Sequence, residues 1–316
     1  MTKIITICGP TGIGKTGFAI ALARELNGEI IGADSMQIYK YMDIGTAKPD
    51  ARERQLARHH LVDFLDPADS FDAKQFTTLA DQAISDIVKR GRQPVVAGGT
   101  GFYIRALLHG LFRGEPACPA TLDKLNQTLE ENGGPALHEQ LKTCDPRAAE
   151  KIHPNDGFRI VRALEVFLTT GVPISHCRQI HDFKSNRYQS LTFGLHMDRK
   201  LLYDRINQRV DMMMAEGLLD EVENLVSQGY SLELKSMQSI GYRHMGMYIK
   251  GEVSLEEAVR LLKRDTRRYA KRQFTWFNKE KNLIWIDVKE LEKAVETAKD
   301  FLNTLVLSPP QKRVIL

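Results

Sequence analysis

Cysteine is scarce in this sequence of 316 residues, and the positions of the few cysteines exclude two kinds of stabilisation. The four are Cys8, Cys118, Cys144 and Cys177, with no C-x-x-C pair and no histidine beside them at zinc spacing. Structural zinc sites need closely spaced thiolates, and disulfide frameworks are typical of short, cysteine-dense chains. The pattern therefore argues against both and fits a reducing compartment.

Long hydrophobic runs are also missing, because no stretch approaches the ~20 apolar residues of a membrane span. The chain opens directly into an expected strand at Lys3, which leaves no room for a signal or transit peptide. We therefore expect a cytoplasmic protein with no membrane partner. With 42% hydrophobic and 27% charged residues the composition is that of a globular protein, and the length predicts two structural units. The net charge of +4 alone predicts nothing about nucleic acid.

A glycine-rich loop stands between an apolar run that ends at Cys8 and a helical pattern that begins near Phe18. It matches the phosphate-binding motif G-x-x-x-x-G-K-S/T at each fixed position, in Gly9-Pro10-Thr11-Gly12-Ile13-Gly14-Lys15-Thr16. Strand, loop and helix are the context that this P-loop requires, because its backbone N–H groups and the helix N-terminus together bind phosphate oxygens. We expect Lys15 to bridge terminal phosphate oxygens and the Thr16 hydroxyl to hold Mg²⁺. The alternative is a tight turn that binds no ligand.

A competing motif overlaps the phosphate-binding motif. Gly12 to Gly17 reads G-x-G-x-x-G, and Asp34 follows at nearly the spacing of the ribose-binding acid of dinucleotide folds. That motif alone is weak evidence, and the Lys15-Thr16 pair has no role in it. The phosphate loop is therefore the favoured interpretation.

Apolar runs of strand length alternate with helical patterns through most of the chain. After the first strand we expect strands at 29–33, 61–65, 94–97, 191–197 and 283–286. Such alternation is typical of a parallel sheet covered by helices. From Gly114 to about Tyr188 only helical patterns occur. The sequence predicts an α/β fold, a P-loop NTPase-like parallel sheet flanked by helices (1–114 and 190–316), with an all-helical insertion domain (115–189).

Two long helical patterns follow the insertion. One has its apolar side from Leu202 to Leu225, without an obvious break. The other opens with a capping box, Ser254 and Glu257, and runs on to Arg272.

The usual companions of a nucleotide-hydrolysing P-loop are weak or missing. The run 61–66 matches a Walker B strand and acid poorly, the strand at 94–97 ends in Gly98-Gly99, and no N-K-x-D guanine motif occurs. We therefore infer that the loop holds a diphosphate that leaves, and not a γ-phosphate that is transferred.

Two polar residues follow expected strands and are candidates for chemistry. Asp34, with Ser35 and Gln37 beside it, fits a general base or a second-shell Mg²⁺ ligand, or equally a turn carboxylate. Thr100, in Gly98-Gly99-Thr100-Gly101, fits a hydroxyl at the ligand edge of the sheet, or a turn with a helix cap. The residues alone leave both choices open.

A basic and aromatic segment lies near the C-terminus. From Arg260 to Lys281 there are nine lysines and arginines against two acids, with Tyr269, Phe274, Trp276 and Phe277 interleaved. Cations neutralise phosphates and aromatic rings stack on unpaired bases, so the segment favours an RNA surface. The alternative is a solvated helix face with its aromatics in the core.

A series of ordered motifs then identifies a family. The chain resembles the bacterial tRNA dimethylallyltransferases, also called tRNA isopentenyltransferases or IPP transferases, over nearly its whole length. The resemblance rests on GPTGIGKT at 9–16, DSMQIY at 34–39, MDIGTAKP at 42–49, GGTGFY at 98–103, HPND at 153–156, RALEV at 162–166, GYR at 241–243 and KRQFTW at 271–276.

The resemblance implies a reaction and its catalytic residues. In this family the P-loop and Mg²⁺ hold the diphosphate of dimethylallyl diphosphate, and the prenyl group goes to N6 of adenosine 37 of tRNA. Asp34 matches the general base, Thr100 a residue lining the reaction channel, and Arg209 an arginine that supports the diphosphate beside Lys15. From the residues alone, Arg209 is an exposed helix charge.

The resemblance also implies where tRNA binds. Besides Asp34 and Thr100, the matching positions are Ser35, Met36 and Gln37; Phe158, Arg159, Ile160, Val161 and Arg162; Gln238, Ser239, Ile240, Gly241, Tyr242 and Arg243; and Lys271, Arg272, Gln273, Phe274, Thr275, Trp276, Phe277 and Asn278. The insertion is expected to brace the anticodon stem. We expect a monomer.

Three other functions stay open on the sequence. An adenylate isopentenyltransferase would prenylate free AMP, but needs neither the insertion nor the basic segment. A P-loop small-molecule kinase would consume ATP stoichiometrically. An RNA-binding NTPase switch would bind RNA according to its nucleotide and form no product.

Overall fold

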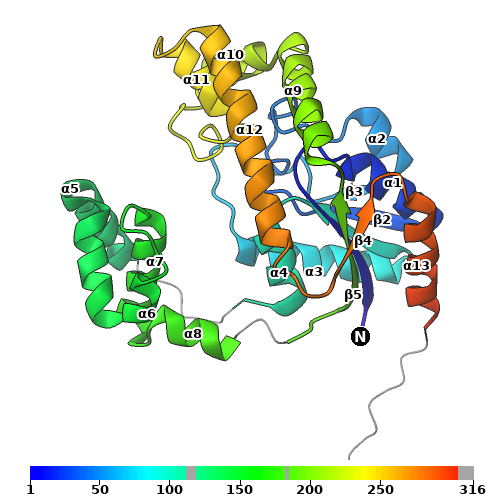
Figure 1. Cartoon of the computed structure of the whole chain (residues 1–316), viewed down its shortest axis with the longest axis horizontal. Coiled ribbons are helices and arrows are strands. Elements are labelled where there is room, and N and C mark those ends of the chain that lie inside the picture. The colour runs from blue at the N-terminus through cyan, green and yellow to red at the C-terminus, as the bar shows by residue number, and fades with distance from the viewer. Residues whose placement is uncertain (112–118, 182–184, 305–316) are drawn as a thin grey trace, which may run out of the picture. The chain divides into compact units, whose positions relative to one another are not determined.

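The computed structural model describes residues 1–111, 119–181 and 185–304 (Figure 1). The chain divides into two compact units, one made of Met1–Leu108 and the chain from Arg187 onward, the other of His109–Asn186. Cys118 and the expected boundary between Gly114 and Glu115 lie outside the described residues. The other expected boundary, 189–190, comes too late, because Gln189 already pairs with Lys3 in the sheet.

The first unit is built on a sheet of six strands with the order β3-β2-β4-β1-β5-β6. All of its pairings are parallel. The strands are β1 Lys3–Cys8, β2 Gly28–Gly32, β3 His59–His60, β4 Gln93–Gly98, β5 Gln189–His196 and β6 Leu283–Asp287. Parallel strands end at the same edge of a sheet, so the segments after β1, β2 and β4 lie next to one another, with β4 in the middle. The expected α/β fold is confirmed.

Helices cover the sheet and extend beyond it. They are α1 Lys15–Glu25, α2 Ala51–Leu56, α3 Ala73–Lys89, α4 Gly101–His109, α9 Arg199–Ala215, α10 Leu218–Ser227, α11 Tyr242–Ile249, α12 Leu255–Phe277 and α13 Leu291–Asn303. α1 packs on β2, β4 and α13, and α12 packs along α9 and α11. α9 to α12 lie together beyond the sheet edge (Figure 1).

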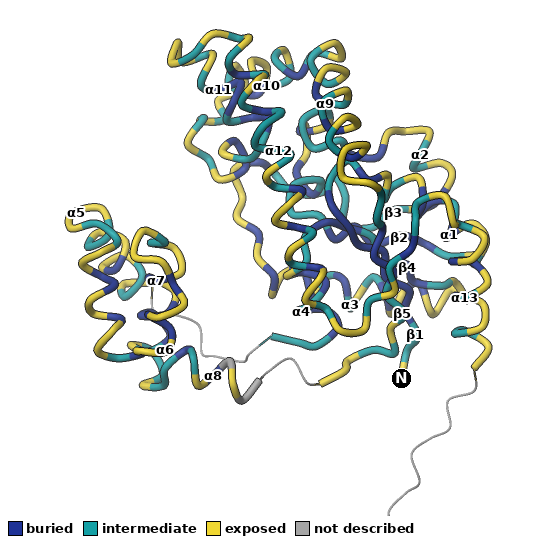
Figure 2. The backbone as a smooth tube through the Cα atoms, viewed as in Figure 1, coloured by how far each residue is buried: buried dark blue, intermediate teal, exposed yellow. Residues whose placement is uncertain are grey.

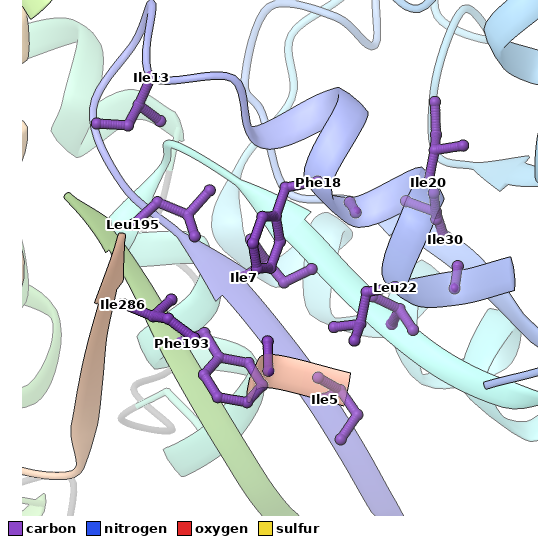
Figure 3. Close-up of a cluster of buried hydrophobic side chains, with 14 of the residues drawn as sticks. Ile5, Ile7, Ile13, Phe18, Ile20, Leu22, Ile30, Phe193, Leu195 and Ile286 are labelled. Atoms are coloured by element: carbon purple, nitrogen blue, oxygen red, sulfur yellow. The ribbon is translucent and has the colours of Figure 1, made fainter. Parts of the chain in front are cut away.

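The core of this unit lies between the sheet and helices α1 and α13. Ile5, Ile7 and Phe193 point from the strands toward Phe18 and Leu22 of α1 (Figure 3). All five side chains are buried, Phe18 the most exposed of them at 6%. Because burying one such side chain contributes about 1.5–3 kcal/mol, this cluster fixes β1 and α1 on either side of the glycine loop.

The expected strand at 61–65 is wrong. β3 comprises only His59 and His60, and the chain then bends, with Leu61 at φ 58° and Asp63 at φ 61°. These left-handed conformations are incompatible with a strand. Val62 of this run packs against Gly32 at the end of β2, where a Cβ would lie 2.9 Å from Val62 Cγ2.

The two long helical patterns also differ from expectation. The first is broken at Gly217 (φ 98°), so that α9 and α10 are separate helices. The second, α12, continues past Arg272 to Phe277. Ser254 caps it as expected by accepting from the N–H of Glu257, but the Glu257 carboxylate pairs with Arg260 and not with the N-terminal backbone.

Every element described between residues 119 and 181 is a helix, in agreement with the expected insertion. The helices are α5 Pro119–Cys144, interrupted at Gly133, α6 Pro146–Ala149, α7 Gly157–Thr170 and α8 Ile174–His181. Leu125, Leu137, Leu141 and Leu164 share one core, and buried stretches of chain occur along α5 and α7 (Figure 2). Gly171 ends α7 in the left-handed conformation (φ 69°).

Throughout residues 1–111, 119–181 and 185–304, none of the helices has both the length and the apolarity needed to cross a bilayer.

Candidate active site

A cavity of about 1280 Å³ opens at the carboxyl edge of the sheet in the first unit. Its walls come from the glycine loop, the segment after β2, residues 43–54, α9, residues 239–240 before α11, and α12. Lys15, Thr16, Asp34 and Arg209, all candidates from the sequence, line it together. Lys15 and Arg209, which are 194 positions apart in the chain, thus meet at one site.

The glycine loop has the conformation of a phosphate cradle. Gly9, Gly12 and Gly14 have φ values of 150°, 80° and 99°. At Gly12 a Cβ would also come within 2.8 Å of Ile206 on α9, so a side chain is excluded both by conformation and by space. Ile13 between them is fully buried and anchors the loop in the sheet core.

The start of α1 is open to an anion. Its N-cap is Gly14, which offers no side-chain cap, and the first turn contains no acid. The first N–H groups of a helix lack intrahelical acceptors and attract negative charge. Lys15 and Thr16 present this turn to the cavity.

Three cations face the same space. Burial lowers the pKa of Lys15 to about 8, against the opposing effect of Asp34, and its Nζ donates to the carbonyl of Pro10 at 2.9 Å. Burial also lowers the pKa of Arg209. Arg205, one helical turn before Arg209, places Nη2 3.4 Å from the position of a Cβ on Gly14. An anion bound here would relieve both the burial and the mutual repulsion of these charges.

Sequence reasoning missed Arg205. Within the described residues neither Arg205 nor Arg209 forms an ion pair or a hydrogen bond with the protein. The signal available was their spacing of four positions, which puts both on one face of a helix.

Asp34 is a turn carboxylate, and it keeps one oxygen available to act as a general base. Its Oδ1 accepts from the N–H of Met36 at 2.9 Å and of Gln37 at 3.4 Å. Both hydrogen bonds that it accepts within the described residues end on Oδ1, so Oδ2 is available to a proton from a ligand. The two interpretations left open by the sequence are therefore compatible.

Thr100 is bonded to a residue of the cavity lining, Ser35. Its hydroxyl accepts from the N–H of Ser35 at 3.0 Å and donates to the Ser35 hydroxyl at 3.4 Å, while its own N–H donates to Ala33. Ser35, Met36 and Gln37 line the cavity, and Thr100 is not among the lining residues. In this structure its contacts hold the segment that carries Asp34.

The residues present fit a magnesium ion only if a ligand completes its shell. The described residues contain no cluster of three or more His, Cys, Asp or Glu that could hold a metal. The Thr16 hydroxyl and the Asp34 carboxylate do line the cavity together. Mg²⁺ commonly keeps several waters and takes substrate phosphate oxygens besides one or two protein ligands, which matches this sparse donor set.

The wall formed by residues 43–49 is tied to α10. The Glu221 carboxylate accepts from three successive N–H groups, those of Asp43, Ile44 and Gly45, at 2.8–3.1 Å. It also accepts from the hydroxyl of Tyr242 at 2.5 Å. The Tyr242 ring presses on Gly45, where a Cβ would lie 2.5 Å from Cε2. Tyr242, expected to contact tRNA, is fully buried, and Glu221 was not singled out in the sequence.

Gln273 is a further buried polar residue at the site. Its side chain, in the last turns of α12, accepts from the N–H of Thr11 at 2.8 Å and donates to the carbonyl of Gly99 at 2.9 Å. Only 6% of the residue is exposed. The sequence placed Gln273 in a tRNA surface, but the structure places its side chain between two loops.

The aromatic residues of the same segment also pack within the protein. Phe274 stacks on Trp285 with ring centroids 5.1 Å apart, and Phe277 is 2% exposed. The Trp276 ring carries the guanidinium of Arg105 at 4.3 Å. The core alternative therefore holds for Phe277, while Lys271, Arg272, Thr275 and Asn278 are exposed and keep the predicted tRNA contact open.

Several of the cations are paired internally. Asp265 binds Arg243 and Arg264 at 2.7 and 2.9 Å, and these arginines and His244 hold the pKa of Asp265 far below its usual range. Lys263 pairs with Asp211 at 2.6 Å. The basic face is thus smaller than the count of charges suggests.

Of the remaining residues predicted to contact tRNA, some are accessible and others are buried. Ser239 and Ile240 line the cavity, Gln238 is exposed, and Gly241 is the N-cap of α11. In the helical unit, Phe158 is 80% exposed and Arg159 and Arg162 are exposed as well. Ile160 and Val161 belong to that unit's core, so their side chains are not accessible.

Comparisons with known proteins give the family. Residues 37–280 match the model of the family described as IPP transferase. The tRNA dimethylallyltransferase of Desulfosudis oleivorans is 53% identical over 302 residues, covering 95% of this chain and 96% of that protein. The one from Acetivibrio thermocellus is 48% identical over 308 residues, covering 96% and 98%.

Solved structures agree. The tRNA isopentenylpyrophosphate transferase of Bacillus halodurans superimposes with a TM-score of 0.72 at 42% identity, over 96% of this chain and 97% of that one. A eukaryotic dimethylallyltransferase acting on tRNA gives 0.82 at 30% identity, over 96% and 80%. With its phosphate cradle, its sheet and these relatives, the chain belongs to the IPP transferase family.

Proposed function

We propose that this protein transfers a dimethylallyl group from dimethylallyl diphosphate to N6 of adenosine 37 in tRNA and releases diphosphate. The observation that carries the proposal is the composition of one cavity: the glycine cradle, with Lys15, Arg205 and Arg209, lines it together with the carboxylate of Asp34. Such a site suits a reaction in which an anion departs on one side while a proton is removed on the other.

The departing side is formed by the cradle. As the bond from C1 of the allyl group to the bridging oxygen breaks, negative charge gathers on the diphosphate. The amides at the start of α1 with Lys15, Arg205 and Arg209 are positioned to stabilise that charge without rearranging. A magnesium ion held by Thr16 would neutralise part of the same charge when bound.

The accepting side is formed by the segment after β2. The exocyclic amine of adenine is a poor nucleophile because its lone pair is delocalised into the ring. As N6 bonds to C1, Asp34 would take the N6 proton on Oδ2, while Oδ1 stays fixed by Met36 and Gln37. Ser35 and Met36 line the cavity and suit contacts to the base.

The target base must leave the stack of the anticodon loop to reach this cavity, as base-modifying enzymes require. The exposed Lys271 and Arg272 on α12, and Phe158, Arg159 and Arg162 of the helical unit, are the residues that we assign to the tRNA backbone and loop. The insertion would brace the anticodon stem. We propose that the protein works as a cytoplasmic monomer.

The experiment that tests this function supplies radiolabelled dimethylallyl diphosphate, Mg²⁺ and unmodified tRNA with adenosines at 36, 37 and 38, and no ATP. Label should enter the tRNA of the wild-type protein at adenosine 37 and not that of the Asp34→Ala variant. Label in added AMP alone would make the protein an adenylate isopentenyltransferase. ATP cleavage without prenyl transfer would indicate a P-loop small-molecule kinase.

A further inference from the structure

Three loops at the sheet edge must keep a fixed spacing if one side of the cavity is to remove a proton while the other receives a diphosphate. The cradle follows β1, the Gly98–Gly101 loop follows β4, and Asp34 follows β2. Since β4 lies between β1 and β2, its loop separates the cradle from the carboxylate. Whatever holds the middle loop to both neighbours sets the distance between the two halves of the reaction.

One side of the middle loop is held within the sheet layer. The Thr100 hydroxyl accepts from Ser35, and the Thr100 N–H donates to Ala33, on either side of Asp34. Gly98 allows this approach, because a Cβ there would lie 2.0 Å from the carbonyl oxygen of Ala33. The β2 and β4 loops are therefore joined without a gap.

The other side is held by a residue from a distant helix. Gln273 accepts from the N–H of Thr11 in the cradle and donates to the carbonyl of Gly99 in the middle loop. Both partners are backbone groups with a fixed role, so one amide must present its oxygen to the donor and its nitrogen to the acceptor. Glycine at position 99 leaves room for this amide, because a Cβ there would lie 2.4 Å from the Gln273 amide nitrogen and 3.5 Å from Lys15 Nζ.

We propose that Gln273 is a positioning residue of the reaction, through which α12 fixes the cradle relative to the loops that carry Thr100 and Asp34. The inference rests on the proposed function and assigns Gln273 a role other than contact with tRNA. It also gives α12 two roles, one on its exposed side and one on its buried side. Its exposed Lys271 and Arg272 directly precede Gln273. The helix that we assign to tRNA contact therefore also holds the cradle.

Substitution of Gln273 tests the role through the two bonds. Gln273→Leu makes neither bond. We expect its kcat for prenyl transfer to fall about 10²-fold, the cost of a misplaced reacting group. Its affinity for inorganic diphosphate, measured by calorimetry without tRNA, should fall about tenfold. The KM for tRNA should change less than about twofold, because Gln273 does not face solvent.

Gln273→Glu supplies a readout that a purely structural role would not move. A protonated carboxyl accepts on one oxygen and donates through the other, as the amide does, whereas the ionised form cannot donate to Gly99. Burial favours the protonated form. The activity of this variant relative to wild type should therefore rise as the pH falls, while the ratio for Gln273→Leu stays flat.

Matched changes at Gln82, an exposed glutamine on α3, serve as controls and should leave all these quantities unchanged. Thermal unfolding of each variant separates lost positioning from lost folding.

An increase in the KM for tRNA with normal kcat and diphosphate affinity would make Gln273 a tRNA contact and overturn the proposal. Equal pH profiles for wild type and Gln273→Glu, with Gln273→Glu no more active than Gln273→Leu, would also overturn it. If wild type binds diphosphate but transfers no prenyl group, the proposed function fails while the comparison of diphosphate affinities still decides the role of Gln273.

Discussion

The hydroxyl of Tyr242 donates to Glu221 at 2.5 Å, on the same carboxylate that holds three backbone N–H groups of the cavity wall. Two residues outside the sheet thus keep residues 43–45 of this wall in place. A glutamine at position 221 would offer one acceptor oxygen and turn an NH₂ group toward other donors. We expect Glu221→Gln to lower the free energy of unfolding by about 1–3 kcal/mol and Tyr242→Phe by about 1 kcal/mol.

Urea unfolding measures both losses. Glu223→Gln, on the exposed face of the same helix, is the control. Because residues 43–49 line the cavity, the KM for dimethylallyl diphosphate should rise in Glu221→Gln. An unchanged urea midpoint would show that the carboxylate is not needed to hold the wall.

Lys15 should make diphosphate binding sensitive to pH. Burial lowers the pKa of its amine to about 8, so in the free protein the amine is charged below that pH and neutral above it. The affinity for diphosphate should therefore fall as the pH rises through about 8. Arginine stays charged over this range, so Lys15→Arg should fall less steeply. Calorimetry from pH 6.5 to 9.5 gives both profiles, and parallel curves would contradict the lowered pKa.

The paired arginines of α9 should act on the diphosphate and not on the tRNA. Hydrogen bonds to charged groups contribute about 1.5–3 kcal/mol, so Arg205→Ala and Arg209→Ala should each raise the KM for dimethylallyl diphosphate at least about tenfold. Lys200→Ala, an exposed change on the same helix, should not. If Arg205→Ala raised only the KM for tRNA, its partner would be a tRNA phosphate.

Asp34→Asn separates the two roles of the carboxylate. Asparagine can still accept from Met36 through Oδ1, which keeps the turn, but it cannot take a proton. We expect kcat to fall about 10²–10⁴-fold with little change in KM or stability. A variant with nearly normal kcat would exclude Asp34 as the base.

Phe158 offers a test of the helical unit. At 80% exposure it contributes little to the core, so Phe158→Ala should leave the melting temperature unchanged and raise the KM for tRNA several-fold. Leu168→Ala, on the same helix and 59% exposed, is the matched control. Equal effects of the two substitutions on the KM for tRNA would argue against a specific contact at Phe158.

The sequence predicted those parts of the molecule that depend on local patterns. The strands around Ile5, Ile30 and Val95 and the glycine loop are encoded by neighbouring residues. The run at 61–65 misled because apolar content does not reveal the left-handed turns at Leu61 and Asp63. At the site, Lys15 and Asp34 were recognisable from motifs.

The remaining site residues depend on contacts between distant segments. Gln273 bonds to a residue 262 positions away, and Glu221 to one 178 positions away. No pattern around either residue reports such a partner. A glutamine inside a basic segment is read as surface until its neighbours in space are known.

The strand order has a consequence for how the chain folds during its synthesis. β1 pairs with β4 on one side but waits for β5 on the other, and the helical unit is translated between them. While that unit leaves the ribosome, the open edge of β1 still exposes unpaired backbone groups, the kind of edge on which nascent chains aggregate. The phosphate cradle at the end of β1 can therefore be completed only after Gln189–His196 has emerged, and α12 must follow before Gln273 joins the loops.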